Sequence, residues 1–129
     1  MLIPHFTGPL RERMDKLNAI LAGKREIILV GSSFGGLMAS IFAMENEDRA
    51  KKLILLAPAI NLVDFTPYIK GVLGLPVWIY HGRQDRVIAL GEVEKVARNI
   101  FSDLRFHAVE DDHYLHKTFR VIPWDELLS

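Results

Sequence analysis

The chain has 129 residues, of which 50% are hydrophobic and 25% are charged, a composition typical of one globular domain over residues 1–129. Its 16 basic and 16 acidic residues balance, which argues against a nucleic-acid partner, and the absence of cysteine excludes disulfides, thiolate zinc sites and a cysteine nucleophile. No apolar run reaches the roughly 18 residues of a membrane span and no signal peptide is evident, so we expect a cytoplasmic protein with no membrane partner.

Apolar runs alternate along the chain with segments of helical periodicity. The segments with helical spacing are residues 9–21, 37–44 and 92–100. The strand-like runs are residues 27–30, 53–57, 77–80 and 105–109. No hairpin signal separates them, and runs such as IILV are continuously apolar, as in parallel strands covered on both faces. We therefore predict an α/β fold, a three-layer sandwich with a mostly parallel sheet of about four or five strands.

The first strand-like run leads into a turn that favours a nucleophile. The pentapeptide GSSFG matches the G-x-S-x-G pattern centred on Ser33, between a strand and a helix. Glycine at positions 31 and 35 avoids clashes at so sharp a turn, and Gly36 eases helix–strand packing. The backbone N–H of Phe34 lies at the positive end of the helix, where it can bind an oxyanion. The alternative is a plain structural turn. A phosphate loop is disfavoured because G-x-G-x-x-G and G-K-[ST] are both absent.

Two later loops supply an acid and a base. Asp85 follows the run at residues 77–80 and could orient an imidazole, although it could also form a turn, cap a helix or pair with a neighbouring arginine. His113 follows the run at residues 105–109 and could accept the proton of Ser33. His116, three residues further on, is the competing base.

The remaining histidines and acids in these loops have plainer interpretations. A metal site built from Asp111, Asp112 and His116 is disfavoured, because adjacent carboxylates point apart and nothing fixes a third ligand. We assign structural or surface roles to the other histidines, which are His5, His81 and His107.

Ser33, Asp85 and His113 each follow a successive strand, in the chain order of the α/β-hydrolase fold. The chain resembles a compact single-domain esterase of the α/β-hydrolase superfamily over nearly its whole length. The segments that carry the resemblance are LVGSSFGG, KKLILLAPA, LPVWIYHGRQDRVI and VEDDHYL. The resemblance implies that Ser33 is the nucleophile, His113 the general base and acid, Asp85 its partner, and Phe34 one oxyanion donor. Nothing in the sequence indicates a cofactor.

The sequence departs from this family at its start. Family members carry an earlier strand, ending in a His-Gly turn, whose loop supplies the second oxyanion N–H, and no such segment precedes the run at residues 27–30. The edge of that strand is then open for pairing. We expect that residues 1–6 fill the vacant position, that another chain covers it as in a homodimer, or that the sequence is a fragment of a longer product.

Two function classes remain open. The first is a serine hydrolase that cleaves a small ester or thioester through an acyl-enzyme. Residues 58–74 would form a short lid-like insertion, with an acyl pocket lined by Leu62, Phe65 and Tyr68, although these side chains could equally pack a surface helix. The second is a non-catalytic or weakly active hydrolase-like module that binds a partner. Other chemistry at the same triad, such as C–C bond hydrolysis or perhydrolysis, is a further alternative.

Overall fold

The structure is a computed structural model that describes residues 9–129, so the expectations for His5 and for residues 1–6 lie outside the described residues. The helices are α1 (Leu10–Ile20), α2 (Phe34–Glu45), α3 (Leu90–Ile100) and α4 (Trp124–Leu127). The strands are β1 (Ile27–Ser32), β2 (Ala50–Leu56), β3 (Leu73–Gly82) and β4 (Phe101–Val109). Three short 3₁₀ helices, η1 (Glu47–Arg49), η2 (Val63–Tyr68) and η3 (Phe119–Val121), lie in the connections.

The four strands form one parallel sheet in the order β1-β2-β3-β4, which confirms the predicted fold class. The strands are longer than the apolar runs indicated. β3 begins at Leu73, before Gly74 and Pro76, and the register between β3 and β4 shifts there. Glycine and proline are poor strand residues, so they hid the start of β3 in the sequence pattern.

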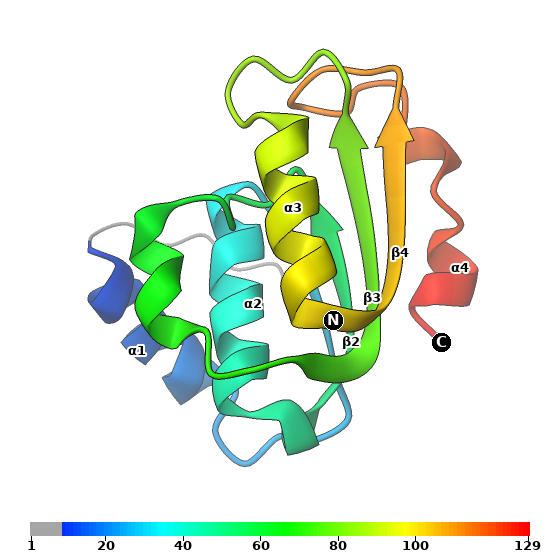
Figure 1. The fold of residues 1–129 in the computed structure, drawn as a ribbon. Helices are drawn as coiled ribbons and strands as arrows, with labels where there is room; N and C mark the ends of the chain where they lie inside the picture. Colours follow the sequence, from blue (N-terminus) through cyan, green and yellow to red (C-terminus); the bar gives the residue numbers. More distant parts are fainter. Residues whose placement is uncertain (1–8) are drawn as a thin grey trace.

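Helices cover the two faces of the sheet unequally (Figure 1). α1, α2 and α3 pack on one face, while residues 111–129, including α4, cross the other. Alternate residues of β2 serve the two layers: Leu53 and Leu55 join the larger core, whereas Ile54 and Leu56 join the smaller one. Both faces are therefore apolar, which is why the strand reads as a continuous hydrophobic run.

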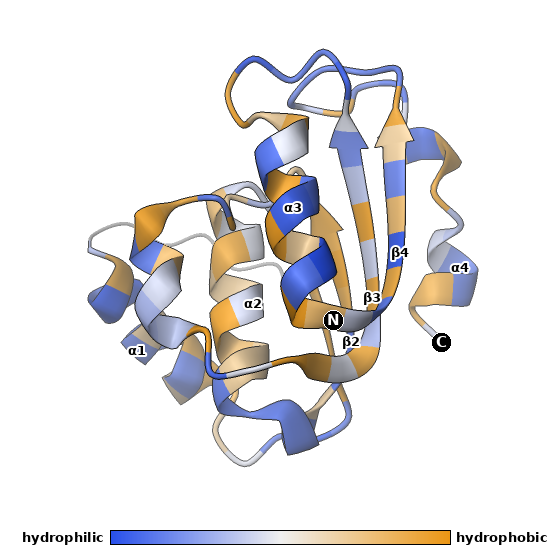
Figure 2. Cartoon of the chain, in the orientation of Figure 1, coloured by the Kyte–Doolittle hydropathy of each residue, from blue (hydrophilic) through white to orange (hydrophobic). Residues whose placement is uncertain are grey.

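α2 is the helix most deeply enclosed in this arrangement. Every residue from Gly36 to Ala43 is buried, and Figure 2 shows a ribbon that is mainly hydrophobic along its length. α2 packs on β1 and β2 and also contacts α1 and η2, so little of its surface meets water. α2 has 12 residues, and no helix within residues 9–129 is long and apolar enough to cross a membrane.

The connections that leave the carboxyl ends of the strands meet at one edge of the sheet. In Figure 1 the loops after β3 and β4 lie side by side beyond the two arrowheads. Hydrogen bonds join them, because Arg83 N–H donates to the Val109 carbonyl (2.8 Å) and Gln84 N–H donates to the Asp111 carbonyl (3.0 Å). The loops that contain Asp85 and His113 are thus held together by their backbones.

Candidate active site

Ser33 occupies a strained turn between β1 and α2. Its backbone has φ 54° and ψ −116°, a conformation that residues other than glycine rarely adopt. Neighbouring backbone fixes the turn: Ser33 N–H donates to the Leu56 carbonyl (2.8 Å), and the Ser33 carbonyl accepts from Ala59 N–H (2.9 Å). The serine is therefore held at the carboxyl edge of the sheet by the last residue of β2 and by the connection that follows it.

Two of the three glycines around Ser33 are required by close contacts. A Cβ atom on Gly31 would lie 2.3 Å from the Gly35 carbonyl oxygen, and one on Gly36 would lie 2.7 Å from the Pro58 Cβ. A Cβ atom on Gly35 would have no heavy atom within 4 Å among the described residues outside the helix's own backbone. The expectation that glycine at 35 avoids a clash is therefore not met, because the turn brings the backbone of residue 35 against position 31 and leaves its own side-chain direction open.

Phe34 begins α2, directly after Ser33. The first N–H groups of a helix have no acceptor within the helix, and the helix dipole makes them favourable partners for negative charge. The Phe34 ring lies beneath the Arg13 guanidinium, whose central carbon is 4.5 Å from the ring centroid. This contact with α1 fixes the side chain while its backbone N–H stays at the helix terminus.

Asp85 lies in the turn after β3 with its side chain fully buried. Its Oδ1 accepts hydrogen bonds from Val87 N–H (2.8 Å) and Ile88 N–H (2.7 Å). Burial alone would raise the pKa of this carboxyl, but the donors of Ile88, His113 and Val87 and the charge of His113 outweigh it and lower the pKa below its usual range. Asp85 is therefore an ionised, buried acceptor.

His113 is the residue that meets this carboxylate. Its Nδ1 lies 2.7 Å from Asp85 Oδ2, and only 10% of its side chain is exposed. Since an ionised carboxylate only accepts, Nδ1 carries the hydrogen, and in the neutral ring Nε2 is then free to accept a proton. No hydrogen bond joins Ser33 to His113 within residues 9–129. Such contacts are often long before substrate binds.

The loop that carries His113 is organised by a second buried carboxylate, Asp111. Its Oδ2 accepts from Lys117 N–H (2.9 Å), Thr118 N–H (2.8 Å) and the Thr118 hydroxyl (2.9 Å), while Oδ1 accepts from Asp112 N–H (2.8 Å). Burial opposes ionisation, but these donors outweigh it and lower the pKa of Asp111. A Cβ atom on Gly82 would lie 2.2 Å from the Asp111 carbonyl oxygen, so this loop packs directly on the end of β3.

The alternative partners considered for these residues are engaged elsewhere. Arg83 pairs with Glu110 (3.0 Å) instead of Asp85, and His116 pairs with Asp112 (3.0 Å) on the exposed side of the loop. The hydrogen bonds of the Asp111 carboxylate stay within its own loop among the described residues, and no cluster of three or more His, Asp or Glu side chains suited to a metal ion occurs within residues 9–129.

The sequence predicts a structural or surface role for His81, and the structure places it in the interior, against Asp85. Its side chain is fully buried at the end of β3, with Nε2 3.2 Å from Asp85 Oδ2 and 2.8 Å from the Ile88 carbonyl oxygen. The position is four residues before Asp85, within the apolar strand pattern. A polar side chain at a buried strand end was the signal that could have identified it.

The residues expected to line an acyl pocket differ in their surroundings. Leu62 is 40% exposed and therefore available to a ligand. Phe65 is fully buried in the larger core, and Tyr68 is partly buried against it. Phe65 thus packs the interior of the domain, and residues 58–74 contain only the short η2 before β3 begins.

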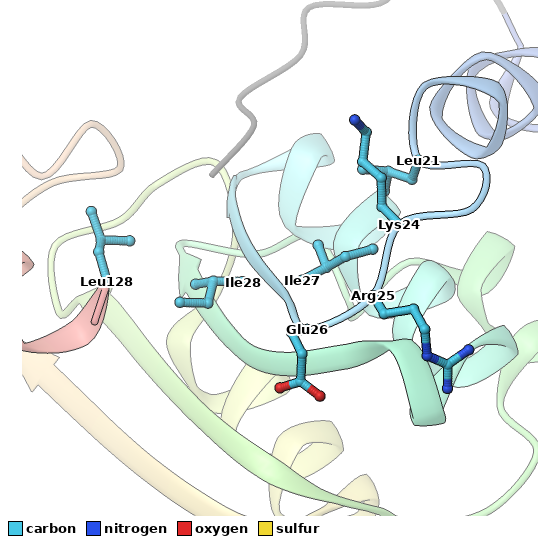
Figure 3. Close-up of a pocket in the computed structure, with 7 residues that line it drawn as sticks. All are labelled: Leu21, Lys24, Arg25, Glu26, Ile27, Ile28 and Leu128. Atoms are coloured by element: carbon cyan, nitrogen blue, oxygen red, sulfur yellow. The ribbon is translucent and has the colours of Figure 1, made fainter.

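A hollow of about 480 Å³ opens at the opposite end of β1 (Figure 3). Its lining comes from the loop between α1 and β1, the first residues of β1 and the last residues of the chain: Leu21, Lys24, Arg25, Glu26, Ile27, Ile28 and Leu128. Ile27 begins the strand that ends beside Ser33, so the hollow lies at the far edge of the sheet from the candidate site.

Comparisons with known proteins place the chain among solved structures of one fold. An α/β serine hydrolase homologue from Coxiella burnetii superposes with a TM-score of 0.75 at 22% identity, over 90% of this chain and 57% of that chain. The mouse α/β hydrolase domain-containing protein 10 superposes with a TM-score of 0.77 at 17% identity, over 94% of this chain and 70% of that chain. Est1E from Butyrivibrio proteoclasticus, with ferulic acid bound, gives 0.77 at 18% identity, over 88% and 65%.

These likenesses come from the comparison of structures. No protein-family model matches the chain, and no curated protein matches it. The chain spans 57% and 56% of the length of two of its structural neighbours, so it corresponds to little more than half of those proteins. At such low identity the comparisons establish the fold.

Proposed function

We propose that this chain, which has the α/β-hydrolase fold, is a serine hydrolase that cleaves a small ester or thioester through an acyl-enzyme. The observation that carries the proposal is the hydrogen bond of 2.7 Å between His113 Nδ1 and Asp85 Oδ2. This pair lies beyond the carboxyl ends of β3 and β4, and the strained Ser33 turn lies beyond the carboxyl end of β1, at the same edge of the sheet.

Each residue has a definite role in this reaction. Ser33 Oγ attacks the carbonyl carbon of the substrate while His113 Nε2 takes the hydroxyl proton. Asp85 keeps the hydrogen of His113 on Nδ1 and stabilises the imidazolium that forms. The Phe34 N–H donates to the developing oxyanion, and His113 returns its proton to the leaving group. In deacylation, His113 Nε2 takes a proton from water as the water oxygen attacks the acyl carbon, and returns it to Ser33 Oγ as the acyl–oxygen bond breaks and the acid leaves.

The short connection after β2 supports a small acyl group as the substrate. Residues 58–74 form no extended cover, and Leu62, 40% exposed, is the member of the expected acyl pocket that remains open to a ligand. A short acyl group suits this surface better than a long chain, which would need a larger apolar cavity. The ferulic acid bound to Est1E indicates that this fold can hold a small carboxylic acid.

Hydrolysis of p-nitrophenyl esters tests this function. We expect the wild-type protein to hydrolyse the acetate and butyrate in preference to the palmitate, and Ser33→Ala to lose this activity. Ser32→Ala provides a matched control, because Ser32 is exposed at the end of β1. Equal rates for wild type and Ser33→Ala would contradict the proposed nucleophile.

A second candidate function is binding of another chain along the edge of β1. Within residues 9–129, β1 pairs only with β2, and Ile28, the second residue of the strand, is half-buried. An open strand edge offers unpaired N–H and C=O groups to another strand. A second copy that adds its own edge would produce a homodimer, which light scattering after size-exclusion chromatography would detect. A monomer at all concentrations would contradict this alternative.

A further inference from the structure

We propose that His81 is a positioning residue that fixes the turn of Asp85 through the Ile88 carbonyl and sets its Nε2–H beside the Asp85 carboxylate, and thereby controls how strongly Asp85 holds His113. The inference rests on the proposed function, because it assigns a task to the carboxylate of the proposed triad. It starts from the complete burial of His81 and from the 3.2 Å between its Nε2 and Asp85 Oδ2.

The protonation of the ring follows from its two neighbours. His81 Nε2 also lies 2.8 Å from the carbonyl oxygen of Ile88, and a carbonyl oxygen can only accept. Nε2 therefore carries a hydrogen. Nδ1 is buried and has no hydrogen-bond partner among the described residues, so a second hydrogen there would be left without an acceptor. The ring is therefore neutral, with its hydrogen on Nε2, where it is donated to the Ile88 carbonyl and lies beside the Asp85 carboxylate.

This arrangement completes the coordination of Asp85. Its Oδ1 accepts hydrogen bonds from Val87 N–H and Ile88 N–H, while its Oδ2 is hydrogen-bonded to His113 Nδ1 at 2.7 Å and lies 3.2 Å from His81 Nε2. The His81 N–H dipole and the His113 hydrogen bond compete for Oδ2, because each draws negative charge toward itself. Loss of the His81 donor would leave more charge on Oδ2 for His113.

Geometry gives His81 a second effect on the same group. It lies in β3, while Asp85 and Ile88 lie in the turn that follows, so its ring ties the turn to the strand. The His113 loop also packs against this strand end at Gly82. One buried ring therefore fixes the position of the carboxylate relative to the histidine that it orients.

The charged groups packed around this centre have other partners. Arg83 pairs with Glu110, Asp112 pairs with His116, and Asp111 binds its own loop. Glu92, in α3, accepts a hydrogen bond from Asn61. Arg86, in the turn after β3, is exposed. Within residues 9–129, the groups in direct contact with the Asp85 carboxylate are thus its two backbone donors and the two histidine rings.

The substitutions that test the inference are His81→Leu and His81→Gln. Leucine fills the space but cannot donate, whereas the amide of glutamine can place a donor near the position of Nε2. His107→Leu is a matched control, because His107 stacks on Tyr80 at an exposed position of β4. Circular dichroism and thermal unfolding report whether each variant is folded.

The first readout is independent of activity. Nitrogen–proton NMR correlation spectra of the wild-type protein should show His81 as the neutral ring with its hydrogen on Nε2. The hydrogen-bonded Nδ1 proton of His113 should move further downfield in His81→Leu and stay near the wild-type position in His81→Gln and His107→Leu. A His81 hydrogen on Nδ1 would overturn the inference, as would a folded His81→Leu protein with an unchanged His113 signal.

The second readout is the pH dependence of Ser33 labelling by a fluorophosphonate. In His81→Leu, the acid limb of the rate profile should move to higher pH. Without the His81 N–H beside it, the Asp85 carboxylate keeps more of its negative charge and favours the protonated imidazole of His113. Glutamine should restore the wild-type profile. An unshifted profile in folded His81→Leu would contradict the inference. If His81→Leu does not fold, the inference is tested by the tautomer of His81 in the wild-type protein and by the His113 Nδ1 proton signal in His81→Gln. The inference requires the His81 hydrogen on Nε2 and a His113 signal near its wild-type position. If wild type is not labelled, the proposed function fails, and the NMR signals still test His81.

Discussion

The Nδ1 atom of His113 lies 2.7 Å from Oδ2 of Asp85, although the two residues are 28 positions apart in the chain. The Asp85 side chain is fully buried, and the His113 side chain is 10% exposed. Two loops that follow neighbouring parallel strands bring them together, and backbone hydrogen bonds between the loops hold them there. This contact links the fold to the proposed chemistry.

Asp85→Asn should remove most of the activity without removing the fold. The asparagine amide can turn its N–H toward His113, which favours the tautomer that cannot accept a proton from Ser33. We expect ester hydrolysis to fall by about 10³- to 10⁴-fold. Asp103→Asn is the matched control, because Asp103 lies in an exposed pair with Arg105. Equal losses in the two variants would contradict the assignment.

Ser33→Gly should lose activity but gain stability relative to Ser33→Ala. The backbone of Ser33 has φ 54° and ψ −116°, where a Cβ atom is strained and glycine is not. We expect the free energy of unfolding of the glycine variant to exceed that of the alanine variant by about 1 kcal/mol, measured by urea denaturation. The opposite order would show that the turn stores no strain at this residue.

Gly31→Ala and Gly35→Ala should differ sharply although both glycines frame the same serine. A Cβ atom at position 31 meets backbone at 2.3 Å, so the elbow must shift, and we expect a loss of roughly 1–3 kcal/mol or more. Position 35 has open space in the first turn of α2, where alanine favours the helix by up to about 1 kcal/mol. Chemical denaturation of both variants distinguishes them, and equal losses would refute this account of the turn.

Asp111→Asn should destabilise the His113 loop. Asparagine keeps one acceptor oxygen but replaces the other with an NH₂ group. That group faces N–H and O–H donors that bind the Asp111 carboxylate in the wild-type protein, so a buried donor is left unpaired. We expect a loss of about 1–3 kcal/mol in the free energy of unfolding. Asp48→Asn is the matched control, because the Asp48 side chain is 73% exposed. A neutral Asp111→Asn would show that the loop does not depend on this carboxylate.

The same carboxylates make stability depend on pH. The pKa values of Asp85 and Asp111 are lowered in the folded protein, so the unfolded chain binds more protons in the acid range. Their contribution is complete above the unfolded value of about 4 and is lost as pH falls through the folded values. The midpoint temperature of thermal unfolding should therefore decrease as the pH is lowered below about 4, and it should decrease less steeply in Asp111→Asn than in the wild-type protein. An unchanged slope in that variant would contradict the linkage.

The sequence pattern predicted the parts of the fold that depend on local periodicity. Apolar runs identified the four strands that the structure describes within residues 9–129, and the G-x-S-x-G turn identified the junction between β1 and α2. The order of loops then placed Asp85 and His113 at one edge, because the carboxyl ends of parallel strands meet there. These inferences need only the chain order.

Contacts between distant residues could not be inferred in this way. The role of Asp111 depends on Thr118 and Lys117 folding back onto it, and that of His81 depends on the shape of the turn at Asp85. Phe65 is an apolar aromatic residue of the kind expected in a pocket, but tertiary packing buries it in the core. Side-chain environment is set by the assembled layers, so periodicity alone does not distinguish a pocket from a core.

The most direct test of the central claim is mass spectrometry of the intact protein after treatment with a fluorophosphonate. We expect one adduct per chain, mapped by peptide analysis to Ser33, and no adduct in Ser33→Ala. His113→Ala should label far more slowly, because the base that activates the hydroxyl is absent. A folded wild-type protein that gains no adduct, or gains it at Ser32, would contradict the assignment of Ser33 as the nucleophile.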